Sequence, residues 1–362
     1  MLMLMFTGLM KTLVLKMDPE APDAEKIRFA ADIIRRGGLV AFPTETVYGL
    51  GADALNPKAV LALFEAKKRP LDNPPIVHVG KIEDVYALVE EVPEKAKRLM
   101  EVFWPGPLTL IFKRSKFVPD VTVAGLDTVA IRMPGHNVAL ALIRESNCPI
   151  AAPSANLAGR PSPTTAQHVL DDLAGRIDAV LDAGPTKIGV ESTVLDITVD
   201  PPQILRPGGV SYEVLKDFLG EVDLNPVAIA NKELPINEVR SPGVKHKHYA
   251  PKAEMFLVEG PVIAIVEKIN ALSRDFKNRG FKVGVLATDE TAAYYHDVDV
   301  VKSLGSRSNL TEIARNLFRL LREFDSDGVD IIFAEGIPAH GVGLAVLNRL
   351  RKASGYRILK AE

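Results

Sequence analysis

Charged and hydroxyl side chains that could hold an anion gather in six short motifs within the first two-thirds of the chain. Three motifs carry cations, namely KKRP at 67–70, TVAIR ending at Arg132, and LRPGG containing Arg206. The other three carry hydroxyl, amide or carboxylate groups, namely PTETVYGLG at 43–51, APSAN at 152–156 and EST at 191–193. Lysine offers phosphate a point charge and arginine a bidentate fork. Together the motifs predict a site that binds and aligns anions.

The sequence lacks the motifs of several common enzyme classes. It contains no GxxxxGK[ST] phosphate loop, no GxSxG nucleophile elbow and no HExxH zinc motif. Gly341-Val-Gly343 resembles the start of a dinucleotide fingerprint, but Val346 stands where the third glycine belongs. No Ser–His–Asp or Cys–His relay is apparent, so the motifs suit alignment of bound groups better than covalent catalysis.

Several of these features also have a structural interpretation. The cations at 67–69 end a predicted helix, where they would also offset the helix dipole. Arg132 ends an apolar strand and must meet an anion, which is either a substrate or an internal carboxylate. His78 alone is typical of a satisfied structural histidine. His246 and His248 are expected to be exposed linker histidines rather than metal ligands, since no further ligand is identifiable.

These motifs must be positioned by a mixed α/β domain. Apolar runs predict strands, and amphipathic runs with caps predict helices between them. The predicted strands are 13–15, 38–42, 76–79, 108–112, 129–132, 149–152, 179–181, 193–197 and 203–205, and the predicted helices are 23–36, 56–69, 93–103, 138–145 and 165–173. The polar motifs fall at strand ends and strand–helix turns, where α/β folds bind ligands.

A second, smaller domain is expected after a long linker. The stretch 221–254 is rich in proline and shows no periodic apolar pattern. Beyond it, strands at 262–266, 282–287 and 331–334 alternate with helices ending near 279 and at 309–324 and 343–352, which is typical of a Rossmann-like parallel sheet. The sequence therefore predicts a catalytic domain at 22–220, a linker or lid at 221–254 and a C-terminal domain at 255–362.

The composition limits the classes of function. The chain has 362 residues, 47% of them hydrophobic, and a formal net charge of −2. Proteins that bind nucleic acid in bulk usually carry a basic excess, so only a local RNA-binding patch is compatible with this charge. The lone cysteine, Cys148, excludes an internal disulfide framework. With no apolar segment long enough to span a bilayer, a soluble cytoplasmic protein is expected.

In their order along the chain, PTETVYGLG, KKRP, SAN, EST and LRPGG closely resemble the YrdC-like L-threonylcarbamoyladenylate synthases. The later SPGVKHKHYAP and the additional α/β domain resemble the long, two-domain form of that family. The resemblance implies a twisted mixed-sheet catalytic domain that makes threonylcarbamoyl-AMP and pyrophosphate from L-threonine, bicarbonate and ATP, with a divalent metal, usually Mg²⁺. It also implies that other proteins use the product to modify tRNA.

The resemblance also implies roles for individual residues. Catalytic roles fall on Lys67 and Arg69, the family's Lys-x-Arg pair. Threonine-binding positions are Thr46, His78, Arg132, Ala152 and Ser192, with the threonine carboxylate on Arg132. ATP-binding positions are Arg69, Asn73, Thr128, Ser154, Asn156, Ser162, Arg206 and Tyr249, where Tyr249 belongs to a linker that folds over the nucleotide. No residue is assigned as a metal ligand.

Two competing functions are weighed against this one. An RNA-binding protein could use a cation-lined face to hold tRNA or double-stranded RNA, although neither the net charge nor any aromatic-rich basic stretch favours it. A carbamoyl transferase using carbamoyl phosphate would release phosphate rather than pyrophosphate. Direct tRNA binding is left open by the sequence.

Overall fold

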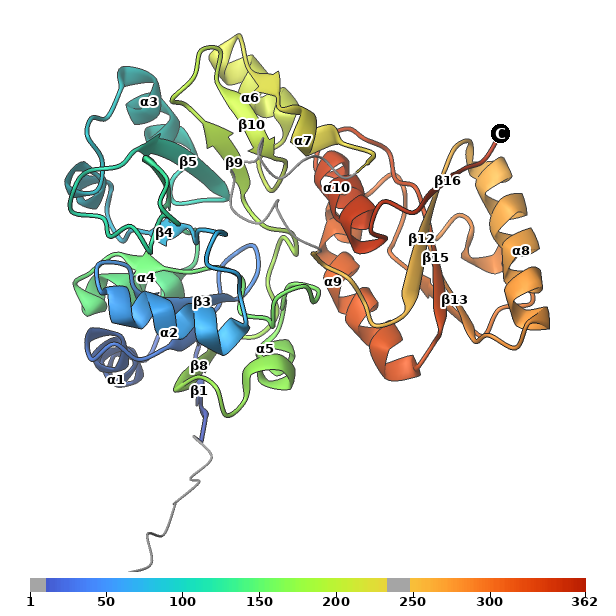
Figure 1. The fold of residues 1–362 in the computed structure, drawn as a ribbon, viewed down its shortest axis with the longest axis horizontal. Coiled ribbons are helices and arrows are strands. Elements are labelled where there is room, and N and C mark those ends of the chain that lie inside the picture. Colours follow the sequence, from blue (N-terminus) through green and yellow to red (C-terminus); the bar gives the residue numbers. More distant parts are fainter. Residues whose placement is uncertain (1–10, 233–247) are drawn as a thin grey trace, which may run out of the picture.

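The computed structural model describes residues 11–232 and 248–362. Figure 1 shows two domains side by side, a larger one built from the first part of the chain and a smaller one that ends at the C-terminus. Within the described residues, no helix has the length and apolar character needed to cross a membrane.

The larger domain is built on a mixed sheet of eleven described strands. Neighbouring strands follow the order β1-β8-β2-β3-β7-β4-β6-β5-β9-β10-β11. Their bounds are β1 Leu13–Lys16, β2 Val40–Phe42, β3 Gly49–Asp53, β4 Val77–His78, β5 Leu108–Lys113, β6 Thr128–Arg132, β7 Ile150–Ala151, β8 Ala179–Asp182, β9 Thr193–Asp196, β10 Gln203–Arg206 and β11 Asp223–Leu224. The sheet contains parallel pairs such as β4 with β6 and antiparallel pairs such as β5 with β6, which confirms the predicted mixed sheet.

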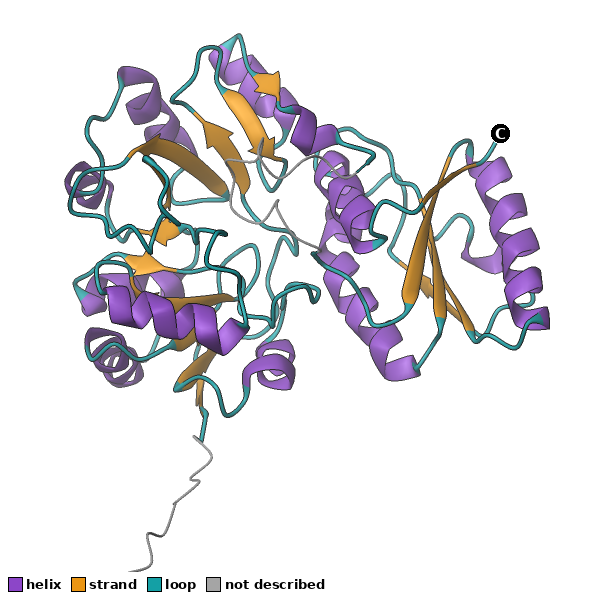
Figure 2. Cartoon of the chain, in the orientation of Figure 1, coloured by secondary structure: helices purple, strands orange, loops and turns teal. Residues whose placement is uncertain are grey.

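Seven described α-helices surround this sheet (Figure 2). They are α1 Ala24–Arg35, α2 Pro57–Lys67, α3 Glu94–Phe103, α4 Asn137–Ser146, α5 Ala166–Leu173, α6 Tyr212–Leu219 and α7 Pro226–Ile229, with a 3₁₀ turn η1 at Ile82–Ala87. The predicted starts of α1 and α2 are confirmed, because Asp23 and Asn56 each accept backbone N–H groups as N-caps. The side-chain carboxylate or amide oxygen thereby satisfies donors that the helix itself leaves unpaired.

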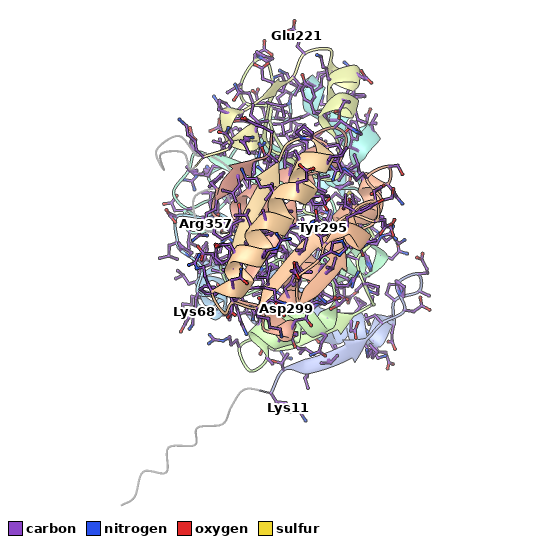
Figure 3. The ribbon with its side chains drawn as sticks, turned by 90° about the vertical axis from the view of Figure 1, so that its right-hand side faces the viewer. Lys11, Lys68, Glu221, Tyr295, Asp299 and Arg357 are labelled. Atoms are coloured by element: carbon purple, nitrogen blue, oxygen red, sulfur yellow. The ribbon has the colours of Figure 1, made fainter. Side chains whose placement is uncertain are left out.

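The smaller domain has a five-stranded parallel sheet in the order β14-β13-β15-β12-β16, as expected for a Rossmann-like fold. Its elements are β12 Glu254–Glu259, α8 Val262–Asn278, β13 Val283–Ala287, η3 Ala292–Tyr294, β14 Val300–Ser303, α9 Leu310–Asp327, β15 Ile331–Glu335, α10 Gly343–Ala353 and β16 Ile358–Lys360. Helices α9 and α10 lie between this sheet and the larger domain (Figure 1). Helix α8 covers the outer face, which Figure 3 views directly.

Some predicted elements are wrong. The run at 262–266 opens helix α8 instead of forming a strand, and the strand precedes it as β12. The expectation of no element after 221 is also wrong, because β11 joins the large sheet and α7 follows it. Strands β3, β14 and β16 and helix α6 had no counterpart among the predicted elements.

Apolar side chains form several cores, and one of them contains residues of both domains. The largest core of the first domain includes the only tryptophan, Trp104, which is 5% exposed and donates its indole N–H to the Leu108 carbonyl at 2.7 Å. The core under α9 and α10 also contains Val47 and Val190 from the larger domain. The two domains therefore share a packed apolar contact, which fixes their relative placement.

Buried ion pairs add to this contact. Arg322 on α9 reaches Asp172 on α5 at 2.8 Å, with both side chains at most 6% exposed. Arg349 on α10 reaches Glu191 at 2.9 Å. Because buried charges are costly unless paired, these two ion pairs require the domains to stay docked.

Candidate active site

One pocket receives residues from all six motifs. The space between its lining residues that no protein atom fills, open solvent included, is about 580 Å³. The described residues that line it are Thr44, Thr46, Val47, Gly49, Arg69, Pro74, Pro75, Ile76, His78, Arg132, Ala152, Pro153, Ser154, Glu191, Ser192, Arg206, His248 and Tyr249. The motifs meet because β4, β6, β9 and β10 place their ends around one point of the large sheet.

Two arginines of the pocket are held by backbone oxygens. Arg69 donates to the carbonyls of Asn73 at 2.8 Å and Pro74 at 3.1 Å. Arg206 donates to the Ser192 carbonyl at 3.0 and 3.2 Å and to its hydroxyl at 3.1 Å. Within the described part of the chain, Arg206 forms no ion pair within 4.0 Å. Loss of hydration lowers the pKa of Arg69 to about 10, so this guanidinium stays charged at neutral pH and can attract an anion.

The third arginine already meets a carboxylate. Arg132, at the end of β6, lies 2.6 Å from Glu45 and donates through Nε to the Gly106 carbonyl at 3.1 Å. Both partners of the ion pair are at most 9% exposed. The structural interpretation of Arg132 therefore holds in this state, and its contact with a substrate carboxylate stays a prediction.

Neutral polar groups complete the pocket wall. His78 Nδ1 lies 3.1 Å from the Ile76 carbonyl, which can only accept, so Nδ1 carries the proton. Burial, and then the charge of Arg132, lowers the pKa of His78 to about 3, which keeps the ring neutral at physiological pH. The hydroxyl of Thr46 lies 2.8 Å from that of Thr44, and the hydroxyl of Ser192 lies 2.8 Å from that of Thr109.

Lys67 lies behind the pocket rather than in its wall. It is the last residue of α2, 1% exposed, and donates through Nζ to the carbonyls of Ser154 and Asn156. Burial, and then the nearby charge of Arg69, holds the pKa of Lys67 well below its usual range. Lys67 is thus bonded to the Ser-x-Asn segment and fixes the shape of the wall.

Four more predicted site residues do not line the pocket: Asn73, Thr128, Asn156 and Ser162. Asn156 donates its amide to the carbonyls of Leu157 and Arg160, and Ser162 donates to Glu191 at 2.6 Å. Thr128 opens β6 opposite Lys113 on β5. The predicted substrate contacts of all the site residues, in the wall or behind it, stay predictions.

Two residues at or behind the pocket wall, His248 and Arg349, were not predicted, whereas Tyr249 was predicted and lines the pocket. His248 was expected to be exposed but is half-buried in the pocket wall, and burial followed by the charge of Arg69 holds its pKa well below the usual range. His246 lies outside the described residues. Tyr249 is 3% exposed and stacks on Phe318 of α9 with ring centroids 5.2 Å apart. No local signal marked Arg349, which reaches Glu191 from the other domain.

Comparison with known proteins identifies the family. A family model described as Telomere recombination matches residues 32–208, and one described as Threonylcarbamoyl-AMP synthase, C-terminal domain, matches residues 210–355. The threonylcarbamoyl-AMP synthase of Pyrococcus abyssi is 53% identical over 335 residues, covering 92% of this chain and 96% of that protein. The chain belongs to the threonylcarbamoyl-AMP synthase family.

Further relatives agree with this assignment. The threonylcarbamoyl-AMP synthase of Bacillus subtilis is 51% identical, covering 92% of this chain and 94% of that protein. The crystal structure of P. abyssi Sua5 complexed with L-threonine superposes with a TM-score of 0.92 at 50% identity, covering 97% of this chain and 100% of that chain. The family resemblance and the two-domain α/β fold predicted from the motifs are confirmed. The threonylcarbamoyl-AMP synthase family comprises nucleotidyltransferase-type enzymes, so the chain is one as well.

Proposed function

We propose that this chain joins L-threonine, a one-carbon unit from bicarbonate, and ATP into threonylcarbamoyl-AMP, with release of pyrophosphate. The observation that carries the proposal is the single pocket in which Arg69, Arg132 and Arg206 meet hydroxyl groups. An amino acid carboxylate and a triphosphate are both anions, and such a pocket can hold them next to each other. The name shared by relatives more than 50% identical supports the same reaction.

The chemistry needs alignment more than a protein nucleophile. Protonated bicarbonate loses water to give CO₂, and the threonine amine forms an N–C bond to that carbon and releases a proton to solvent, which gives a carbamate. A carbamate oxygen then attacks the α-phosphorus, and the bond to pyrophosphate breaks. In-line displacement at phosphorus depends on positioning and on charge neutralisation, which fixed cations supply.

Each arginine has a place in this proposal. The guanidinium of Arg132 would be shared between Glu45 and the threonine carboxylate, because it has several N–H donors. Arg69 and Arg206, bonded to carbonyl and hydroxyl oxygens, keep their charge for the triphosphate. His78 is neutral, so the positive charge at this point of the pocket comes from Arg132, and the ring can contribute hydrogen bonds only.

Magnesium is proposed as an ion that arrives with ATP rather than one held by protein ligands. The described residues include no group of three or more His, Cys, Asp and Glu side chains that could hold a metal. Glu191, the acidic side chain in the described pocket wall, already accepts Ser162 on one oxygen and Arg349 on the other. The donor set therefore does not fit a protein-held magnesium site, and no step is assigned to one.

The proposal also covers the protein's surroundings. Threonylcarbamoyl-AMP is a reactive mixed anhydride, so a tRNA-modifying transferase should consume it nearby. We propose the cytoplasm as the place of work, where a lone thiol such as Cys148 stays reduced. Direct tRNA binding is not needed for the reaction proposed here.

The test is release of pyrophosphate by the purified protein with ATP, Mg²⁺, bicarbonate and L-threonine. Release should depend on threonine, and threonylcarbamoyl-AMP should be detectable by mass spectrometry. Equal release without threonine, or release of phosphate from carbamoyl phosphate, would contradict the proposal.

A variant tests the threonine site separately. Arg132→Lys keeps a charge but loses the fork, so the dissociation constant for L-threonine should rise about tenfold in calorimetry. Arg114→Lys is a matched control, because Arg114 pairs with Asp120 away from the pocket wall. Unchanged threonine affinity in Arg132→Lys would remove Arg132 from the threonine site.

A further inference from the structure

One side chain of the smaller domain reaches three segments around the pocket. Arg349 on α10 is fully buried. Its Nε donates to Glu191 at 2.9 Å, and its Nη1 donates to the Pro207 carbonyl at 2.8 Å. Its guanidinium carbon lies 5.5 Å from the centre of the Tyr249 ring. Glu191 and Tyr249 line the pocket, and Pro207 follows the pocket residue Arg206.

Glu191 is the centre of this arrangement. One carboxylate oxygen accepts from Ser162 at 2.6 Å, and the other accepts from Arg349. Burial alone would raise the pKa of Glu191, but the charges of Arg349 and then Arg206 lower it to about 2. The carboxylate is therefore ionised, and two arginines compete to neutralise it.

The two arginines share this task unequally. Arg349 hydrogen-bonds the carboxylate directly, whereas Arg206 hydrogen-bonds the backbone and hydroxyl of Ser192. A buried carboxylate without a bonded cation is costly. If Arg349 were absent, Glu191 would draw on Arg206, whose charge also stabilises the carboxylate. Arg206 would then have less charge to offer an anion in the pocket.

We propose that Arg349 is a positioning residue of the synthase reaction: by neutralising Glu191 from the smaller domain, it keeps Arg206 free for the phosphates of the nucleotide. This proposal rests on the function proposed above. It gives the smaller domain a defined part in catalysis, because α10 supplies the arginine that hydrogen-bonds Glu191. Arg349 itself touches no substrate in this scheme.

The test compares Arg349→Met with the wild type in pyrophosphate release. The KM for ATP should rise about tenfold, the loss expected for one charge-assisted hydrogen bond. The KM for threonine should change less than about threefold, since Arg132 is not bonded to Arg349. Unchanged KM for ATP would overturn the proposal, whereas an inactive wild type would instead contradict the proposed function.

A double variant that also removes the charge of Glu191 distinguishes a positioning role of Arg349 from a packing role. In Glu191→Gln/Arg349→Met, the neutral amide no longer competes for Arg206, so the KM for ATP should return to within about threefold of wild type. A purely structural role for Arg349 predicts a double variant at least as impaired as Arg349→Met. If Arg349→Met does not fold, the double variant is compared with wild type alone. A KM for ATP more than about tenfold above the wild-type value would then overturn the proposal.

Arg322→Met is the matched control for domain docking. Arg322 is also a buried arginine of the smaller domain, but its partner Asp172 is not among the described residues that line the pocket. The melting temperature of this variant should fall while its KM for ATP stays within about threefold of wild type. An equal rise in the KM for ATP in both arginine variants would assign the effect to docking and overturn the specific role of Arg349.

Discussion

Individual side chains of the pocket divide into those whose charge is used within the protein and those whose charge stays available. Arg132 and Arg349 each meet a carboxylate, whereas Arg69 and Arg206 are bonded to carbonyl and hydroxyl oxygens. Hydrogen bonds from neutral oxygens orient a guanidinium without cancelling its charge. The available charges therefore identify the part of the pocket best suited to phosphates.

His78 should make stability depend on pH. Its folded-state pKa of about 3 lies below the usual 6.5, so the unfolded chain binds the extra proton, and stability falls as pH drops below 6.5. From pH 6.5 to 5 this histidine should cost about 1.5 kcal/mol of unfolding free energy. Urea unfolding of His78→Gln should show a shallower decline over that range. His296→Gln, which changes an exposed histidine, should keep the wild-type slope.

Residue types and order were enough to predict the neighbourhood of the site, because polar motifs after buried strands meet at one edge of a sheet. They were not enough to separate the wall from its support. Lys67 and Arg69 are two positions apart, yet one bonds the backbone behind the wall and the other lines the pocket. Arg349 could not be predicted, since its contact with Glu191 joins positions that are distant in sequence.

Elements were predicted best where caps and periodicity agreed, as for α1, α2 and α9. The run VIAIV at 262–266 is rich in β-branched residues and favoured a strand. Pro261, which caps α8, and Gly260 at φ +156 mark the true boundary between β12 and that helix. Strand β3 was missed because its sequence, GLGAD, lacks β-branched residues. The strand needs glycine at position 51, since a Cβ there would lie 2.9 Å from the side chains of Phe42 and Ile150.

Gly208 should be needed for the packing of β10 against the start of β9. A Cβ at this position would lie 2.3 Å from the backbone of Ser192 and Thr193, which cannot move easily. Gly208→Ala should therefore cost about 1–3 kcal/mol and reduce synthase activity by separating Arg206 from Ser192. Thermal unfolding and pyrophosphate release test this. Gly135→Ala, whose Cβ would come no closer than 3.4 Å to its neighbours, should have a smaller effect on both.

The molecule as a whole depends on contacts that cross between its two sheets. Arg322 on α9 reaches Asp172, Arg160 lies 3.4 Å from Asp325 on α9, and Val47 and Val190 enter the core of the smaller domain. A contact of mixed charge and apolar character holds two domains more firmly than a polar surface alone. We therefore expect the domains to unfold as one unit.

Arg322→Met tests the strength of this contact. It leaves the buried carboxylate of Asp172 with Arg160 as its remaining ion-pair partner among the described residues, so the loss should be about 3 kcal/mol or somewhat less. Asp172→Asn/Arg322→Met should recover part of this loss, because removing both charges together leaves no unpaired ion. Denaturant unfolding curves of the three proteins give the comparison. A double variant less stable than Arg322→Met would contradict this account.

The place of Trp104 gives the protein a built-in optical reporter. The only indole of the chain lies in the core of the larger domain, while the smaller domain holds tyrosines and phenylalanines alone as aromatic emitters. Tryptophan fluorescence, excited at the red edge of the absorption band, therefore reports unfolding of the larger domain, whereas calorimetry reports unfolding of both domains. Coinciding midpoints in the two signals would mean that the domains melt cooperatively, and a lower fluorescence midpoint would mean that the larger domain opens first.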